Sequence, residues 1–187
     1  MRKIIISMLA ILTLFFLPSM NSLAKTKTIQ NGASYLPSTK YNYDIYLKYA
    51  YKEKVTVSCK KTEYATRSCV NGNYGNIKEV GVSYYYGDNF LSFGEANNMD
   101  SSIIPGIKFP MKQGKKYTIK NMMTYYKVEA VDSTKKIGSK TYKHVIRIKY
   151  DKYYRVYIAK NYGIILINTL DTKKETTRYK VLNYKKK

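Results

Sequence analysis

The two cysteines of the chain, Cys59 and Cys69, are the first residues whose type and spacing point to a reaction. An even number of cysteines is typical of structural disulfides in proteins of oxidising compartments. Closing this short loop would stabilise the fold by about 2 to 3 kcal/mol. The alternative is two small hydrophobic side chains, with Cys59 on the inward face of a strand. The spacing matches neither a CxxC redox motif nor a metal knuckle.

His144 is the single histidine and therefore the main candidate for a general base. It alternates with Tyr142 and Ile146 on the apolar face of a predicted strand, so we expect a packed imidazole. The chain contains no GxSxG, HExxH, Walker A or GxGxxG motif. We therefore predict a protein that is not an enzyme and has no cofactor. The alternative is a hydrolase that uses His144.

Charge is the dominant feature, because the formal net charge is +22 at pH 7. Such an excess favours polyanionic partners. Only five of the 34 basic residues are arginines, whereas phosphate clamps rely on the planar guanidinium group. A biased composition rich in Lys, Tyr, Asn and Ile would give the same excess without a selected partner. The candidate basic face comprises Lys143, Arg147, Lys149, Lys152, Arg155 and Lys160; in a half-exposed strand such outward residues are polar in any case.

One segment has the opposite charge, since residues 79–107 contain no lysine or arginine. Its acidic residues are Glu79, Asp88, Glu95 and Asp100. Carboxylate and amide oxygens are calcium ligands, but their spacing here fits no EF-hand. We predict no metal site, and expect a loop that packs on the basic surface or orients the protein on a charged partner.

The elements that position these residues begin after a predicted signal peptide, residues 1–24. Arg2 and Lys3 precede an apolar run, and Ser22-Leu23-Ala24 has the form of a cleavage site. The run is short for a membrane span, and a retained anchor is the alternative. Removal of the signal lowers the net charge from +22 to +20.

The remaining chain is expected to comprise a flexible segment (25–40), one β-rich domain (41–184) and a basic tail (185–187). Apolar and polar residues alternate with a period of two over most of the domain, which is typical of half-exposed strands. Gly94 to Gly114 contains Pro105 and Pro110 and is predicted to be a long connection; Glu95 to Ile104 is the best place for a short helix. The expected fold is mainly β: a single antiparallel meander sheet curved into a half-barrel or sandwich, with little helix.

Two details of the sheet are also predicted. Pairing Ile148 with Val156 and Ile146 with Ile158 keeps apolar residues on one face, which requires an odd-numbered loop around Lys152. The continuous apolar run Ile164–Ile167 is typical of a strand covered on both faces.

The second half resembles a known module. The segments FPMKQGKKYTI (109–119), KVEAVDSTKKIGSKTYKHVIRIK (127–149) and YRVYIAKNYGIILI (154–167) are similar to a curved-sheet module of exported proteins and lipoproteins of Gram-positive bacteria, most without an assigned activity. The pattern is also distantly similar to LolA/LppX-like lipid carriers, although the sequence shows no clear helices of the kind that plug their curved sheets. The resemblance implies an architecture rather than a reaction.

The function expected from these features is that of a secreted, non-enzymatic binding protein at the cell envelope. Anionic wall polymers or lipid headgroups would retain it by electrostatic attraction. No RNP-type motif or zinc knuckle is present, so no specific nucleic acid is expected. The alternative is an extracellular carrier that holds a lipid or another amphiphile in the concave face of the sheet.

Overall fold

The computed structural model describes residues 26–48, 51–63, 65–71, 80–95, 102–119, 124–171 and 174–187. Most of these residues lie in β-strands, and the helical element among them is a single 3-10 turn, η2 (Ala33–Tyr35). The prediction of a mainly β fold with antiparallel pairing is confirmed. The predicted signal peptide lies outside the described residues.

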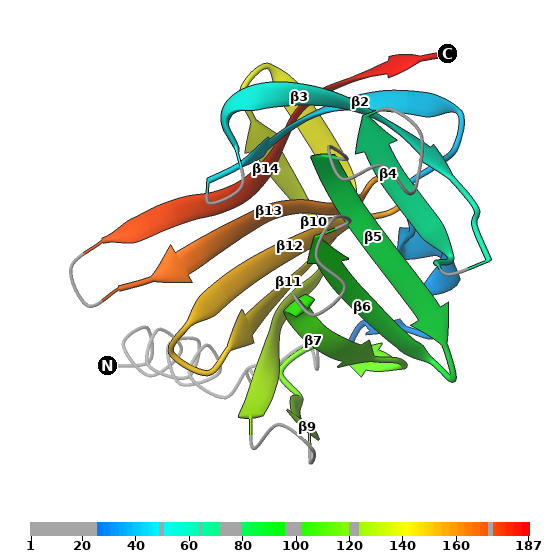
Figure 1. Ribbon diagram of the computed structural model, residues 1–187. Helices are drawn as coiled ribbons and strands as arrows, with labels where there is room; N and C mark the ends of the chain where they lie inside the picture. The colour runs from blue at the N-terminus through cyan, green and yellow to red at the C-terminus, as the bar shows by residue number, and fades with distance from the viewer. Residues whose placement is uncertain are drawn as a thin grey trace, which may run out of the picture.

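Twelve strands form one antiparallel sheet in the order β7-β6-β5-β4-β3-β2-β14-β13-β12-β11-β10-β9 (Figure 1). Neighbouring strands of this sheet follow one another in sequence, with the exception of β14 and β2. β14 pairs with the preceding strand β13 on one side and with β2 on the other, where it joins two meanders. The bounds are β2 (Tyr41–Leu47), β3 (Tyr51–Lys60), β4 (Arg67–Asn71), β5 (Val80–Gly87), β6 (Phe90–Glu95), β7 (Ser102–Lys108), β9 (Lys116–Ile119), β10 (Thr124–Ile137), β11 (Lys140–Tyr150), β12 (Tyr154–Ala159), β13 (Gly163–Leu170) and β14 (Glu175–Lys186).

The sheet curls until its two ends meet, so the half-barrel is nearly a closed barrel (Figure 1). The Tyr126 hydroxyl on β10 reaches the backbone of Lys108 on β7 across this seam. The ring of Tyr117, on the edge strand β9, stacks on that of Tyr126 with 5.1 Å between centroids. β1 (Thr28–Ile29) and β8 (Met111–Lys112) form a separate two-stranded antiparallel sheet. β8 follows β7 in the sequence after two residues. Aromatic side chains thus close the gap that backbone pairing leaves.

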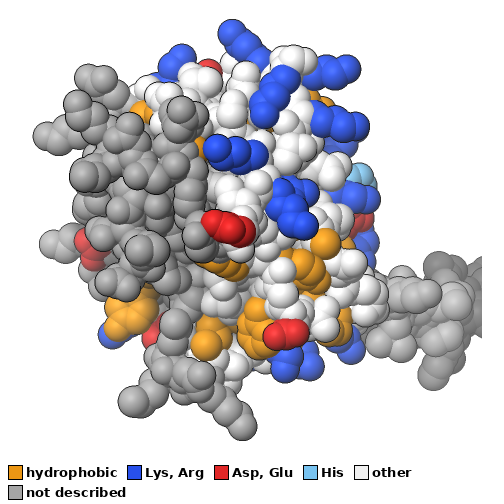
Figure 2. All heavy atoms as spheres, turned by 45° about the vertical axis from the view of Figure 1, so that its right-hand side comes forward, with side chains coloured by type: hydrophobic (Ala, Val, Ile, Leu, Met, Phe, Trp, Pro, Cys, Tyr) orange, Lys and Arg blue, Asp and Glu red, His pale blue; other side chains and the backbone are white. Residues whose placement is uncertain are grey.

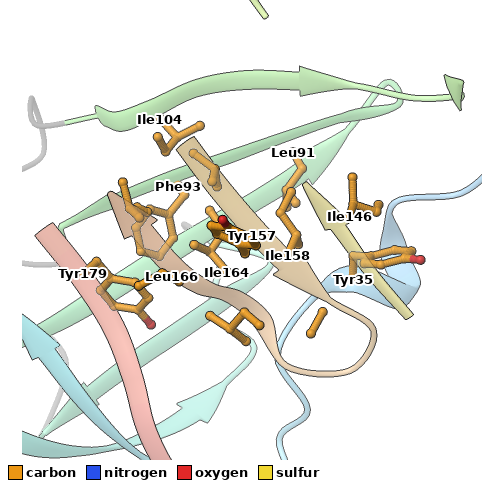
Figure 3. Close-up of a cluster of buried hydrophobic side chains, with 14 of the residues drawn as sticks. Tyr35, Leu91, Phe93, Ile104, Ile146, Tyr157, Ile158, Ile164, Leu166 and Tyr179 are labelled. Atoms are coloured by element: carbon orange, nitrogen blue, oxygen red, sulfur yellow. The ribbon is translucent and has the colours of Figure 1, made fainter. Parts of the chain in front are cut away.

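The interior of the barrel is filled with apolar side chains. On β2, Tyr43, Ile45 and Leu47 are buried and alternate with half-buried polar and aromatic residues, as a period of two requires. Both meanders contribute to one core, in which Figure 3 labels Leu91, Phe93, Ile104, Ile146, Ile158, Ile164 and Tyr179. The cavity lined by Tyr43, Tyr84 and Tyr179 has a volume of only about 10 Å³, the size of a single water site.

The predicted loop around Lys152 is confirmed. Ile146 pairs with Ile158, Ile148 with Val156 and Tyr150 with Tyr154, which leaves a loop of three residues, 151–153. The apolar run at the start of β13 is also buried along its whole length, from Gly163 to Ile167. The hydrophobic pattern therefore determines both the register and the position of this hairpin.

The prediction of a flexible segment over residues 25–40 is wrong for much of its length. Tyr35 and Leu36 are buried in the core, and β1 pairs with β8. The backbone of Asn161, in the β12–β13 turn, donates to Ser34 O and accepts from Ser38 N, both at 2.8 Å. Apolar side chains and paired backbone groups fix this segment against the barrel, although its sequence has no period.

The prediction of a long connection over residues 94–114 is also corrected. Most of its second half is strand, because β7 and β8 lie within it. Ile104, before Pro105 in the sequence, and Ile107, after it, are buried, so apolar residues of this segment contribute to the core. Pro105 lies within edge strand β7, where a missing backbone donor is tolerated. Within the described part of the chain we find no helix with the length and hydrophobicity that a membrane crossing requires.

Candidate functional site

A row of four cationic side chains crosses the outer face of the second meander. The register pairs Lys116 with Lys127, Lys127 with Lys149, and Lys149 with Arg155 on the successive strands β9, β10, β11 and β12. Their sequence neighbours on the same strands, such as Tyr126, Ile148 and Val156, are buried, so the four charged side chains point outward. We call Lys116, Lys127, Lys149 and Arg155 the cation row. Adjacent strands lie about 4.8 Å apart, which brings like charges close together.

Carboxylates partly neutralise the end of the cation row. Arg155 Nε donates to Glu129 Oε2 at 3.0 Å, and Arg155 Nη1 also contacts Glu175. Arg147 Nε forms a second ion pair with the same Glu129 oxygen at 3.0 Å. The three lysines of the row have no carboxylate partner among the described residues. The uncompensated charge is therefore carried by lysines, while the two arginines belong to a local ion-pair network.

Tyrosine rings contact two lysines of β9 and β10. Lys116 Nζ lies 3.4 Å from the centroid of the Tyr125 ring, and Lys135 Nζ lies 4.5 Å from that of Tyr157. Tyr153, in the β11–β12 loop, is 53% exposed. Figure 2 shows many lysine and arginine side chains and few acidic ones on the face in view. Cations over aromatic faces are held in place without losing their charge.

The predicted basic face is divided by the structure. Lys149 and Arg155 belong to the cation row, and Arg147 lies beside it. Lys143 and Lys152 are exposed elsewhere on the same hairpin, and Lys160 lies in the next turn. Sequence reasoning missed Lys116 and Lys127, whose place follows only when the registers of β9, β10 and β11 are aligned.

The prediction of a packed His144 is wrong, because its side chain is 61% exposed; Figure 2 shows the single histidine at the surface. His144 Nδ1 lies 2.6 Å from Asp132 Oδ1 on the neighbouring strand, and Lys27 Nζ lies 3.2 Å from Asp132 Oδ2. Both Asp132 and His144 have positive φ, 54° and 53°. The register of β10 and β11 shifts here, and such an irregularity changes the alternation so that His144 turns outward.

The electrostatics of this pair favour the ionised carboxylate. Hydrogen bonds from His144 and from Lys27 hold the pKa of Asp132 below its usual value of 3.8. Asp132 and His144 line a pocket of about 270 Å³ that is distinct from the filled interior. The other lining residues are Thr28, Ile29, Gln30, Asn31, Ser34, Tyr35 and Lys160.

The predicted disulfide is present between Cys59 and Cys69. The two residues are direct partners on β3 and β4, and both side chains are buried. The disulfide therefore lies in the core and links two adjacent strands covalently. Its burial favours a structural role, because reactive cysteines are usually partly exposed.

The predicted acidic segment is described only in part. Asp88 and Asn89 form the two-residue turn between β5 and β6, and both have positive φ, 47° and 61°, as a type I′ hairpin requires. Glu79 and Asp100 lie outside the described residues, as does the side chain of Glu95. The described residues contain no group of three or more His, Cys, Asp or Glu side chains that could hold a metal ion.

Comparison with protein-family models, with curated proteins and with solved structures gave no significant match.

Proposed function

We propose that this chain is a secreted, non-enzymatic binding protein of the cell envelope, retained there by anionic wall polymers or lipid headgroups. The observation that carries the proposal is the cation row of Lys116, Lys127, Lys149 and Arg155. Like charges directly opposite each other on neighbouring strands destabilise a sheet. A bound polyanion removes that repulsion and releases its own counterions, so the row costs least when a polymer of repeated negative charge lies across it.

The side-chain chemistry also favours a loose form of attraction. Lysine is a point charge on a flexible stem, whereas arginine gives the bidentate geometry of specific phosphate clamps. In the cation row the one arginine is engaged with Glu129 and Glu175. The three lysines that face solvent support attraction to many anionic groups along a polymer or a headgroup layer.

The filled interior gives no support to the alternative of a lipid carrier. Ligand pockets have volumes of about 300 Å³ or more, whereas the cavity between Tyr43, Tyr84 and Tyr179 measures about 10 Å³. An amphiphile would have to displace core side chains. The outer surface is therefore the better candidate for binding.

Extraction of intact cells with salt tests the proposal. Raising the ionic strength from about 0.1 to about 1 M shortens the Debye length from about 10 to about 3 Å, so most of the protein should be released. The same experiment with isolated cell walls and with anionic vesicles identifies the partner. Retention that is equal at both salt concentrations would contradict the electrostatic mechanism.

A charge-reversal pair tests the role of the cation row. The double variant Lys127→Glu/Lys149→Glu should elute at lower salt than the control Lys40→Glu/Lys61→Glu, which changes the net charge equally at two exposed lysines outside the row. Equal elution of the two variants would show that only the total charge matters.

A further inference from the structure

The pocket beside Asp132 and His144 is built by three separate parts of the chain. The segment from Thr28 to Tyr35 forms one wall, the irregular part of β10 and β11 forms the second, and Lys160 of the β12–β13 turn forms the third. Its volume of about 270 Å³ is near the lower end for small-molecule sites, which begin at about 300 Å³. The pocket is therefore large enough for one sugar-sized unit.

Backbone geometry around this pocket is unusual. Asp132, His144 and Asn161 have φ values of 54°, 53° and 68°, a region that residues other than glycine rarely adopt. The first two line the pocket, and Asn161 follows Lys160. Such conformations persist only where the surroundings enforce them, and they cluster at ligand sites.

Hydrogen bonds hold the walls in place before any ligand arrives. Asn161 is bonded through its backbone to Ser34 and Ser38. Asn31 Oδ1 accepts from the backbone N–H of Ala33 and from the Tyr86 hydroxyl. Asp132 accepts from Lys27 and is bonded to His144 Nδ1. A preorganised pocket loses little entropy on binding.

Several polar groups in the pocket are left for a ligand. The bond to Asp132 occupies Nδ1 of His144, and Nε2 has no partner among the residues described. In the same part of the structure the Lys160 ammonium has no carboxylate partner, and Gln30 has no side-chain partner. Lys27 and Lys160 outnumber the single carboxylate of Asp132. The combination of excess positive charge, amides and hydroxyls fits a ligand with one negative charge and several hydroxyl groups.

We propose that this pocket binds a single sugar or polyol unit that carries one phosphate group. Lys160 binds the phosphate, and His144 Nε2 and Gln30 form hydrogen bonds with hydroxyl groups. The choice of ligand rests on the proposed function, because such a unit is the repeating chemistry of a polyanionic polymer and also of a phosphoglycerol headgroup. The pocket would recognise one unit, while the cation row attracts the whole polymer.

The single histidine allows a direct test by proton NMR. In protein produced without a histidine tag, every imidazole C–H signal belongs to His144. Titration with glycerol phosphate or glucose 6-phosphate at constant ionic strength should shift this signal in a saturable manner. No shift at millimolar ligand, or the same shift with sodium sulfate, would overturn the proposal.

Variants measured by calorimetry connect the signal to the pocket. Lys160→Ala and His144→Asn should each weaken binding about tenfold. The first variant loses the ammonium group that binds the phosphate, and the second loses the imidazole Nε2 that bonds a ligand hydroxyl. Asparagine tolerates the left-handed backbone of position 144, which keeps the fold intact. Lys136→Ala, an exposed lysine of β10 that does not line the pocket, is the matched control and should bind normally. An equal loss in this control would overturn the proposal.

Two further arms identify the source of the ligand and separate this site from the cation row. Binding of a soluble polyol-phosphate polymer that weakens with Lys160→Ala would point to a wall polymer, and the same dependence with phosphatidylglycerol vesicles would point to a headgroup. Lys160→Ala should leave the salt-dependent retention of the protein on cells nearly unchanged. The two proposals therefore have independent readouts. If salt does not release the protein from cells but the pocket binds its ligand, only the proposed function fails; if salt releases the protein but the pocket binds no ligand, only this inference fails.

Discussion

The hydroxyl of Tyr126 bonds twice to the backbone of Lys108: it accepts from the Lys108 N–H at 2.7 Å and donates to the Lys108 carbonyl at 3.2 Å. The two residues lie on β7, which is one edge of the sheet, and on β10, which is next to the other edge strand, β9. One side chain therefore satisfies both backbone groups of an edge residue, a role that a neighbouring strand has elsewhere in the sheet. The barrel is closed by this contact and by the stacking of Tyr117 on Tyr126.

Tyr126→Phe should destabilise the protein by about 1 to 3 kcal/mol, because the Lys108 backbone groups lose their partner in a part-buried place. Chemical denaturation followed by circular dichroism measures the change. Tyr142→Phe is the matched control: the Tyr142 hydroxyl is buried and has no hydrogen-bond partner among the described residues, so its removal should be neutral or stabilising. Equal losses in both variants would refute the role of the seam bond.

Alkaline pH should unfold the barrel through its tyrosines. Burial raises the pKa of Tyr84, Tyr126, Tyr150 and Tyr179 above the usual value of 10.0. A raised pKa in the folded state means that the stabilisation is complete below about pH 10 and is lost as the pH rises further. The chain has 22 tyrosines and no tryptophan, so ultraviolet absorbance of tyrosinate reports the titration. The exposed tyrosines should ionise first and the buried ones together with unfolding; a single transition near pH 10 without unfolding would contradict this order.

Loss of the disulfide should destabilise the protein by about 2 to 3 kcal/mol, because the bridge closes a short loop of the unfolded chain. Cys59→Ala/Cys69→Ala and chemical reduction should give similar decreases in the free energy of unfolding. Salt-dependent retention on cells should be unaffected under conditions where the variant is folded, since both cysteine side chains are buried and do not belong to the outer surface.

Gly163→Ala should cost about 2 kcal/mol or more. Gly163 has φ +70°, a conformation that costs an L-residue about 1 to 2 kcal/mol. A Cβ atom there would also lie 2.8 Å from the Tyr84 hydroxyl and 2.9 Å from Pro37 Cδ. Gly114→Ala is the control, because it has a similar φ of +82° but open space around its Cβ position. The difference in unfolding free energy between the variants measures the steric part alone.

The hydrophobic pattern predicts the barrel well where one face of a strand is buried. Ile146, Ile148, Val156 and Ile158 face the core together only when the loop has an odd number of residues. Pairing Ile148 with Val156 then places that loop at Lys152, as observed. The same argument predicts the buried β13. Closure of the sheet does not follow from the pattern, because it depends on the hydroxyl of Tyr126 and on edge strand β7, whose sequence is interrupted by Pro105.

The candidate site was harder to predict for a physical reason. His144 lies where the register of β10 and β11 shifts, and one extra residue reverses the alternation without leaving a mark in the apolar pattern. The hint in the sequence is the polar pair Asp132-Ser133, which follows the adjacent apolar residues Ala130 and Val131 and so breaks the alternation of β10. Of the cation row, the sequence identifies Lys149 and Arg155 but not Lys116 and Lys127. The last two come to lie beside Lys149 only through strand pairing across two hairpins.

The position of β14 has a consequence for the order in which the protein can assemble. This strand is the last of the twelve in sequence, yet among the described residues it is the one that joins β2 to β13 in the sheet. A nascent chain that lacks it therefore has two separate meanders, each with an unpaired edge ready to aggregate. The domain cannot complete its cooperative structure until synthesis has reached this strand, so premature termination there should yield insoluble fragments rather than a smaller barrel.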